Sequence, residues 1–195
     1  MIEGRKGRGG MIEAIERFVP KCEQEERDRE VMLHFLRTNP DAYLRSNTMA
    51  HMTASSWVIS PDGKHIVMVY HNIYNSWAWT GGHADGDHDL RAVAIREAQE
   101  ETGLEHLRPV GDGILSLECL TVDGHVKRGK YVSSHLHLNV TYLLRAEETA
   151  VRQKPDENSG VGWFTPEEAL AASSEPWMVE HVYRKLVERA RKYME

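Results

Sequence analysis

Residues 81–104 read GGHADGDHDLRAVAIREAQEETGL, and this stretch decides the fold of the chain. Its second half places Glu97, Glu100 and Glu101 at positions i, i+3 and i+4, so a helix would carry the three carboxylates on one face. Like charges at this spacing cost an isolated helix roughly 0.2–0.5 kcal/mol per pair. A divalent cation over that face would relieve the repulsion, since hard cations such as Mg²⁺ take oxygen ligands. The stretch therefore predicts a metal site made of glutamates.

The sequence also predicts where this helix begins and ends. Asp89 is the last of three aspartates that could cap its N-terminus, and Gly103 suits the left-handed residue that ends a helix. The expected helix runs from about 89 to 102, with Leu90 and Val93 on the side that packs on a sheet. Strands are expected before and after this one central helix, which indicates an α+β layered domain.

The same residues resemble the Nudix box, the signature of the Nudix hydrolases, which reads G-x5-E-x7-R-E-U-x-E-E-x-G-U with U an aliphatic residue. Its positions are occupied here by Gly82, Arg96, Glu97, Ala98, Glu100, Glu101, Gly103 and Leu104. One residue departs from the pattern, because His88 stands where the family has glutamate. The resemblance implies an α+β fold of the Nudix type, an α/β/α sandwich with a mixed sheet.

The resemblance also implies an activity. Nudix hydrolases use Mg²⁺ or Mn²⁺ to cleave a nucleoside diphosphate linked to another moiety, by attack of water on phosphorus. Carried over to this chain, Glu97, Glu100 and Glu101 are expected to be the metal ligands, and Glu97 is the first choice for the group that takes the proton of the water. Gly82 is expected to offer a backbone carbonyl to the metal, and Arg96 to orient the carboxylates through charge-assisted hydrogen bonds.

Two residues outside this set bear on the metal site. A neutral imidazole at His88 cannot replace the charge of the family's glutamate, so a reduced rate or an altered metal preference is expected, and not a loss of activity. Glu157 is a candidate for the additional downstream carboxylate that some Nudix members use. The alternative for the whole acidic face is a solvated helix surface with an ordinary arginine.

Histidines form a looser group of candidate substrate-binding residues. His135 and His137 alternate with leucines in an expected strand, so both imidazoles face the same side. With His83, and with His71 as a further member, they could donate hydrogen bonds or charge to a phosphate leaving group. The alternative is that the two strand histidines are ordinary half-exposed sheet residues.

Two other features could contact a substrate. Trp79, which alternates with Trp77 toward the glycines, could stack on a base, although paired tryptophans more often pack in a core. Arg128 lies in a basic loop with Lys127 and Lys130 that could clamp a phosphate, although such loops are usually only solvated.

Composition limits the partners. The chain has 195 residues, which suits one domain with a terminal extension, and its formal net charge is -6. The charge gives no broad basic field for a nucleic-acid polymer or an anionic membrane, so a small-molecule nucleotide-type substrate is favoured. Two unrelated cysteines and the absence of a long apolar run indicate the cytoplasm. The resemblance also allows a homodimer, since Nudix relatives are often dimers.

The expected organisation has three parts. Residues 1–10 are rich in glycine and basic side chains and are interpreted as a flexible N-terminus or a cloning remnant. Residues 11–48 form a helical extension, which is either a packing element or a dimer contact or substrate lid. Residues 49–195 form the Nudix hydrolase domain. Within that domain the expected strands are 53–60, 64–71, 114–122, 131–144 and 162–164, and a final amphipathic helix runs from 176 to 193.

Two rival functions remain. The first is a Nudix-fold module that senses a nucleotide without cleaving it, which His88 favours slightly and the three intact glutamates oppose. The second is a prenyl diphosphate isomerase on the same fold, which would need an activated cysteine. Cys119 is its only plausible candidate, and nothing in the sequence around it suggests activation.

Overall fold

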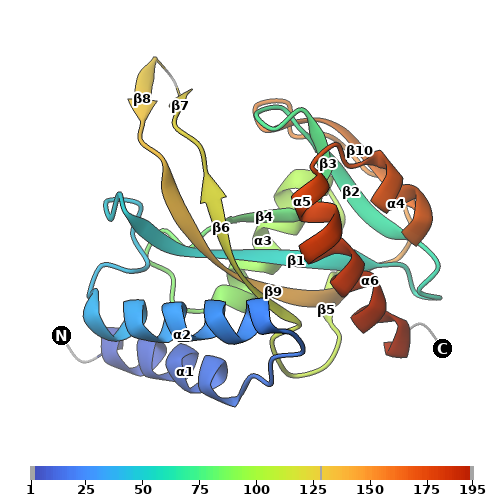
Figure 1. Ribbon diagram of the computed structural model, residues 1–195. Helices are drawn as coiled ribbons and strands as arrows, with labels where there is room; N and C mark the ends of the chain where they lie inside the picture. Colours follow the sequence, from blue (N-terminus) through green and yellow to red (C-terminus); the bar gives the residue numbers. More distant parts are fainter. Residues whose placement is uncertain (1–2, 128, 194–195) are drawn as a thin grey trace.

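A mixed eight-stranded sheet forms the centre of the computed structural model, which describes residues 3–127 and 129–193 (Figure 1). Five strands follow one another in the order β10-β2-β1-β9-β5, while β4 pairs with β1, β3 with β2 and β6 with β9. Their bounds are β1 Ala50–Ile59, β2 Ile66–His71, β3 Ser76–Ala78, β4 Thr80–His83, β5 Arg108–Pro109, β6 Ser116–Val122, β9 His135–Arg145 and β10 Asn158–Phe164. The pairing of β1 with β9 is parallel, and it places His51 opposite His137.

Alternate residues of β1 serve opposite faces of this sheet. Met52 and Ala54 point into a core cluster that contains Leu90 and other residues of helix α3, Leu90–Thr102. Trp57 points to the other face, where its ring stacks on that of Tyr183 with the centroids 5.7 Å apart. Helices thus cover both faces of the sheet, which confirms the predicted α/β/α sandwich.

Helix α3 has the ends that its sequence predicts. The Asp89 side chain accepts a hydrogen bond of 3.0 Å from the backbone N–H of Ala92. Gly103 ends the helix with a φ of 70°, the left-handed conformation that costs glycine little. Both ends depend on local sequence, so the bounds of α3 and the spacing of its acidic residues follow from the sequence of this segment.

The N-terminal part is helical from its first described residue. Helix α1 spans Glu3–Arg17 and helix α2 spans Glu23–Thr38, and they lie side by side near β6 (Figure 1). The flexible start expected for residues 1–10 is therefore replaced by helix from Glu3 onward; residues 1 and 2 lie outside the described residues. Backbone hydrogen bonds extend the helix of residues 11–17 through this glycine-rich stretch, although each glycine costs about 1 kcal/mol relative to alanine.

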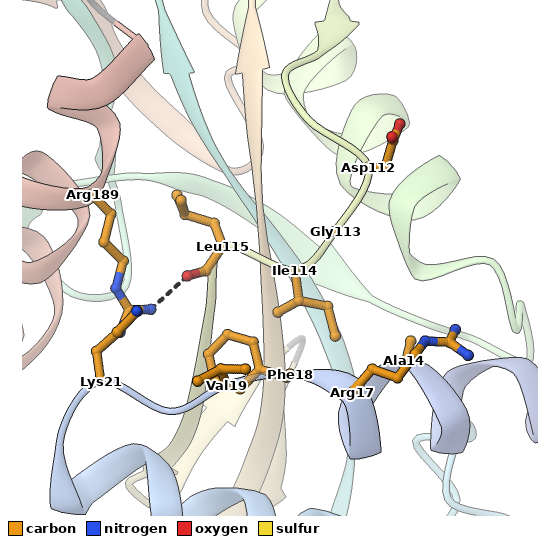
Figure 2. Close-up of a pocket in the computed structure, with 10 residues that line it drawn as sticks. All are labelled: Ala14, Arg17, Phe18, Val19, Lys21, Asp112, Gly113, Ile114, Leu115 and Arg189. Carbon is orange, nitrogen blue, oxygen red and sulfur yellow. Dashed lines mark hydrogen bonds between the residues drawn. The ribbon is translucent and has the colours of Figure 1, made fainter.

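A buried ion pair connects helix α2 of the N-terminal extension to helix α6, Arg184–Ala190, near the C-terminus. Glu25 of α2 has no exposed surface, and Arg189 donates to its two carboxylate oxygens at 2.6 and 2.5 Å. The same guanidinium donates to the carbonyl of Leu115 at 2.5 Å, beside a cavity of about 320 Å³ (Figure 2). The contact joins α2 to α6, and the role of the extension as a packing element, a dimer contact or a substrate lid stays a prediction.

Two expected elements are interrupted in the structure. The strand predicted over 131–144 is split, because Ser134 turns its hydroxyl to the backbone N–H of Gly124 and leaves the ladder. The result is a small hairpin of β7 His125–Lys127 and β8 Lys130–Val132 that projects from the body, followed by β9 (Figure 1). The final helix contains a π-helical turn, Val179–Tyr183, which presents the fully buried Tyr183 to the sheet.

The remaining strands and helices complete the fold. Strand β10 is longer than the predicted 162–164, because it continues its pairing with β2 back to Asn158. Helix α4, Pro166–Ala172, begins with the expected cap, in which Thr165 and Glu168 form a capping box, and helix α5 spans Pro176–Met178. Among the described residues, no helix has the length and the apolar character that crossing a membrane requires.

Candidate active site

Three carboxylates meet where α3 passes β4. Glu97, Glu101 and Glu157 each offer one oxygen, and these oxygens all lie within 4.8 Å of one another. Glu101 is only 4% exposed, whereas Glu97 and Glu157 are half-buried. Glu157 precedes β10, about 56 residues after Glu101, so the fold brings two distant segments to one point.

Glycines allow β4 to approach α3 this closely. A Cβ built on Gly82 would lie 2.4 Å from the carboxyl carbon of Glu97, far inside van der Waals contact. The backbone N–H of neighbouring Gly81 donates to the carboxylate of Glu101 at 3.3 Å. The two box glutamates therefore press directly against the backbone of the strand.

Burial and like charge together make this site electrostatically unfavourable without a cation. Burial raises the pKa of Glu101 well above its ordinary value, and the charges of Glu97 and Glu157 raise it further. The pKa of Glu97 is also raised, first by burial and then by the charge of Glu100. A donor set made only of carboxylate oxygens is what hard divalent cations prefer, so these residues fit Mg²⁺ or Mn²⁺.

Glu100, the remaining glutamate of the box, forms an ion pair with a lysine. The ammonium of Lys154 lies 2.9 Å from Glu100 and 2.9 Å from Glu157, and so bridges α3 to the segment before β10. Sequence reasoning missed Lys154, because a lysine in a loop gives no local signal of a tertiary ion pair. The group of three oxygens thus contains Glu157 in the place that the sequence analysis expected for Glu100.

Arg96 and His88 lie beside this group. The Arg96 guanidinium donates to Asp87 at 3.4 Å, which ties α3 to the loop before it. Its positive charge also lowers the pKa of Glu97, although burial and the charge of Glu100 raise that pKa more. His88 is half-buried, and its ring lies against that of Tyr43, with the centroids 4.1 Å apart.

The candidate histidines gather in a cavity of about 1020 Å³. The four histidines that the sequence analysis named, His71, His83, His135 and His137, all line it. His51, which sequence reasoning did not select, lines it as well. The ring centroids of His83 and His137 are 4.8 Å apart. His51 could have been found only from the register of β1 against β9, which the sequence does not reveal.

The other two substrate-binding candidates lie elsewhere. Trp79 packs edge-on against Tyr183, with the ring centroids 5.7 Å apart, and belongs to the core under α6. It is not among the residues that line the cavity, so the core alternative describes it better than base stacking. Arg128 lies outside the described residues.

Comparison with known proteins agrees with this geometry. Residues 49–189 match the family model of the NUDIX domain. The chain belongs to the Nudix family. It is a Nudix hydrolase, and the hydrolases of this family act on pyrophosphate bonds. No curated protein matches its sequence.

Several solved structures share the fold at low sequence identity. A UDP-X diphosphatase is 14% identical, with a TM-score of 0.52 over 98% of this chain and 95% of its own. The dihydroneopterin triphosphate pyrophosphohydrolase of E. coli is 15% identical, with a TM-score of 0.53 over 71% of this chain and 96% of its own. The Ap4A hydrolase of C. elegans is 19% identical, with a TM-score of 0.50 over 75% of this chain and all of its own.

The only cysteine proposed for the rival isomerase is not activated in this Nudix chain. Burial raises the pKa of the Cys119 thiol far above its ordinary value, and the neighbouring Asp28 raises it further. Its Sγ donates to the backbone carbonyl of Asp28 at 3.8 Å. A thiol held neutral in this way is a poor nucleophile and acid catalyst, so the structure offers the isomerase hypothesis no support.

Proposed function

We propose that this Nudix hydrolase is a divalent-metal-dependent pyrophosphohydrolase that cleaves the diphosphate linkage of a nucleoside diphosphate derivative by attack of water on phosphorus. The observation that carries the proposal is the convergence of Glu97, Glu101 and Glu157, with Glu97 against Gly82 and Glu101 accepting a hydrogen bond from Gly81. The glutamates come from helix α3 and the segment before β10, and the glycines from strand β4. The alternative, a solvated acidic helix surface, gives no reason for these distant segments to converge.

The residues of the site are assigned two tasks, holding a cation and accepting a proton, and Glu97 is a candidate for both. Glu97, Glu101 and Glu157, with the backbone carbonyl of Gly82, would hold Mg²⁺ or Mn²⁺. When bound, the ion neutralises phosphate charge and orders the attacking water. Glu97 would accept the proton of the attacking water, because its carboxylate lies within the cluster.

Lys154 has a positioning role in this scheme. Its ammonium holds Glu100 and Glu157 from one side, and this keeps the Glu157 carboxylate next to α3. Glu100 then adds negative charge at the edge of the site without being one of the three clustered ligands. Arg96 adds positive charge near Glu97, and its hydrogen bond to Asp87 links α3 to the loop that leads from β4.

The cavity lined by His83, His135 and His137 is proposed to take the rest of the substrate. Its volume of about 1020 Å³ has room for a nucleotide-sized molecule. His83 follows Gly82 directly, so the cavity opens on the face of β4 opposite to the one that contacts Glu97, and a bound substrate would extend past this strand to reach both. Similar structures are named for Ap4A, dihydroneopterin triphosphate and UDP-X, and their variety supports a nucleotide-type small molecule without selecting one. Free cysteines, Cys22 and Cys119, fit a cytoplasmic location.

The test is phosphate release from nucleoside triphosphates, nucleotide sugars, ADP-ribose and dinucleoside polyphosphates, each with Mg²⁺, with Mn²⁺ and with a chelator. Turnover of at least one compound with a divalent ion, and none with the chelator, would support the proposal. Binding of nucleotides that raises the melting temperature without any turnover would overturn it in favour of the nucleotide-sensing module that His88 suggests.

A further inference from the structure

Strand β4 separates two clusters of ligand-type side chains. Successive residues of a strand point to opposite faces, and Gly82 faces Glu97 on α3. His83 therefore faces away from α3, into the cavity, where it meets His51 and His137. The acidic cluster and the histidine cluster are thus neighbours along the chain but lie on opposite faces of the strand.

The histidine cluster comes from three adjacent strands. His51 of β1 is the parallel partner of His137 of β9, and His83 of β4 is paired with Thr53, two residues along β1. One ring nitrogen from each of the three histidines lies within 4.8 Å of the other two. The sheet itself, and not a mobile loop, therefore brings three imidazoles together.

His51 has the arrangement of a preoriented ligand. It is 3% exposed, and its Nδ1 lies 3.0 Å from the carbonyl oxygen of Asn47. A carbonyl can only accept, so Nδ1 carries the hydrogen and the neutral ring keeps its lone pair on Nε2. That Nε2 is buried and has no hydrogen-bond partner among the described residues. Metal-binding histidines are typically held in this way, by a second ring nitrogen that donates to a backbone carbonyl.

His135 is fixed in the same manner beside the three. Its Nδ1 lies 2.8 Å from the carbonyl oxygen of Ser133, and its Nε2 lies 3.2 Å from Nε2 of His137. The two rings are thus within hydrogen-bond distance, and His135 orients His137 beside the cluster.

We propose that His51, His83 and His137 bind one transition-metal cation of the Zn²⁺ class, with His135 beside them and an open coordination position toward the cavity. Imidazole nitrogens suit Zn²⁺, Co²⁺ and Ni²⁺, whereas Mg²⁺ prefers the carboxylate oxygens across the strand. Closing the three nitrogens from 4.8 Å to a tetrahedral spacing needs ring movements of about 1 Å or less. The site does not depend on the proposed hydrolytic activity.

The test is Co²⁺ titration of chelator-treated protein, followed by the visible absorption of the bound ion, with Zn²⁺ competition and metal analysis. The wild-type protein is expected to bind one Co²⁺ with the strong bands of a low-coordinate nitrogen site, and Zn²⁺ should displace it. His51→Gln is expected to lose this signal. His34→Gln, which changes an exposed histidine of α2, and Glu101→Gln, which changes the acidic site, should both keep it.

Several results would overturn the proposal. One is a wild-type protein that binds no more Co²⁺ than His51→Gln does, and another is a signal that disappears in Glu101→Gln. Because His51 is buried, the half-buried His83→Gln is measured in parallel, with the melting temperature as the check on folding; a folded His83→Gln that keeps the signal contradicts the site. Stabilisation of the metal-free protein by inorganic phosphate, without Co²⁺ binding, would show that the cluster is an anion site instead.

Discussion

The carboxylate of Glu97 occupies the space that any side chain on Gly82 would need. A Cβ on Gly82 would lie 2.4 Å from the carboxyl carbon and 2.5 Å from a carboxylate oxygen of Glu97. Position 82 of the Nudix box therefore has to be glycine, because Glu97 fills the space that a side chain would take. Gly82 and Glu97, which belong to one sequence motif, are thus also in direct contact in the structure.

Gly82→Ala is expected to displace Glu97 and to lower kcat/KM by roughly 100-fold or more, a loss typical of a misplaced catalytic group. The inserted methyl group should also cost about 1–3 kcal/mol of folding stability. Gly113→Ala is the matched control, since a Cβ at Gly113 meets no atom within 4 Å. Steady-state rates and denaturant unfolding measure both effects, and equal activity of the two variants would refute the coupling.

Glu101→Gln is expected to stabilise the metal-free protein while it weakens divalent-ion binding. Its carboxylate is buried beside Glu97 and Glu157, and removing one charge relieves both burial and repulsion. Thermal unfolding with a chelator should show a higher melting temperature than the wild type, and added Mg²⁺ should raise it less. A lower melting temperature with the chelator would mean that the carboxylate is stabilised by contacts other than a cation.

The ion pair between Glu25 and Arg189 predicts a stability change at low pH. Burial alone would raise the pKa of Glu25, but the hydrogen bond from Arg189 and the charge of Lys185 lower it to about 2. Because the folded pKa is below the ordinary 4.5, this contribution to stability is present above about pH 4.5 and is lost as the pH falls toward 2.

Glu25→Gln tests this sign. At neutral pH it leaves buried cations without their partner and should cost about 3–5 kcal/mol of unfolding free energy. The difference from the wild type should shrink as the pH is lowered from 4.5 to 2 in urea unfolding experiments. Glu26→Gln, at an exposed neighbouring position, should stay close to the wild type throughout. A difference that grows toward low pH would contradict the assignment.

His88→Glu restores the residue that the Nudix pattern has at this position. The variant should raise the rate or shift the preference between Mg²⁺ and Mn²⁺, because it adds a charge beside the box helix that a neutral imidazole lacks. His88→Gln keeps the side chain neutral and serves as the control. Rates in the two metals decide the question, and identical rates and metal preference for the wild type and His88→Glu would show that the position is a bystander.

Local sequence predicted the parts of the site that are local. The Asp89 cap, the Gly103 end and the spacing of Glu97 and Glu101 all lie within one helix, and the structure has each of them as expected. Glu157 was selected only by resemblance, and its contact with α3 depends on how the segment before β10 returns to the sheet.

The parts that sequence reasoning missed depend on strand register and loop closure. Lys154 meets Glu100 across 54 positions of the chain, and no spacing rule covers such a pair. His51 joins His137 only because β1 and β9 pair in parallel with one particular register. The strand split at Ser134 was missed for a related reason, since a serine hydroxyl can replace a ladder partner without changing the apolar alternation.

The measurement that tests the central claim most directly is the Mg²⁺-dependent hydrolysis rate of Glu101→Gln beside Glu105→Gln, on whichever compound the wild type cleaves. Glu101 lies in the buried carboxylate cluster, whereas Glu105 is exposed just past the helix. The account predicts a fall of roughly 100-fold or more for Glu101→Gln and a rate within about twofold of the wild type for Glu105→Gln. Equal rates in the two variants would contradict the account, because hydrolysis would then proceed without the cluster.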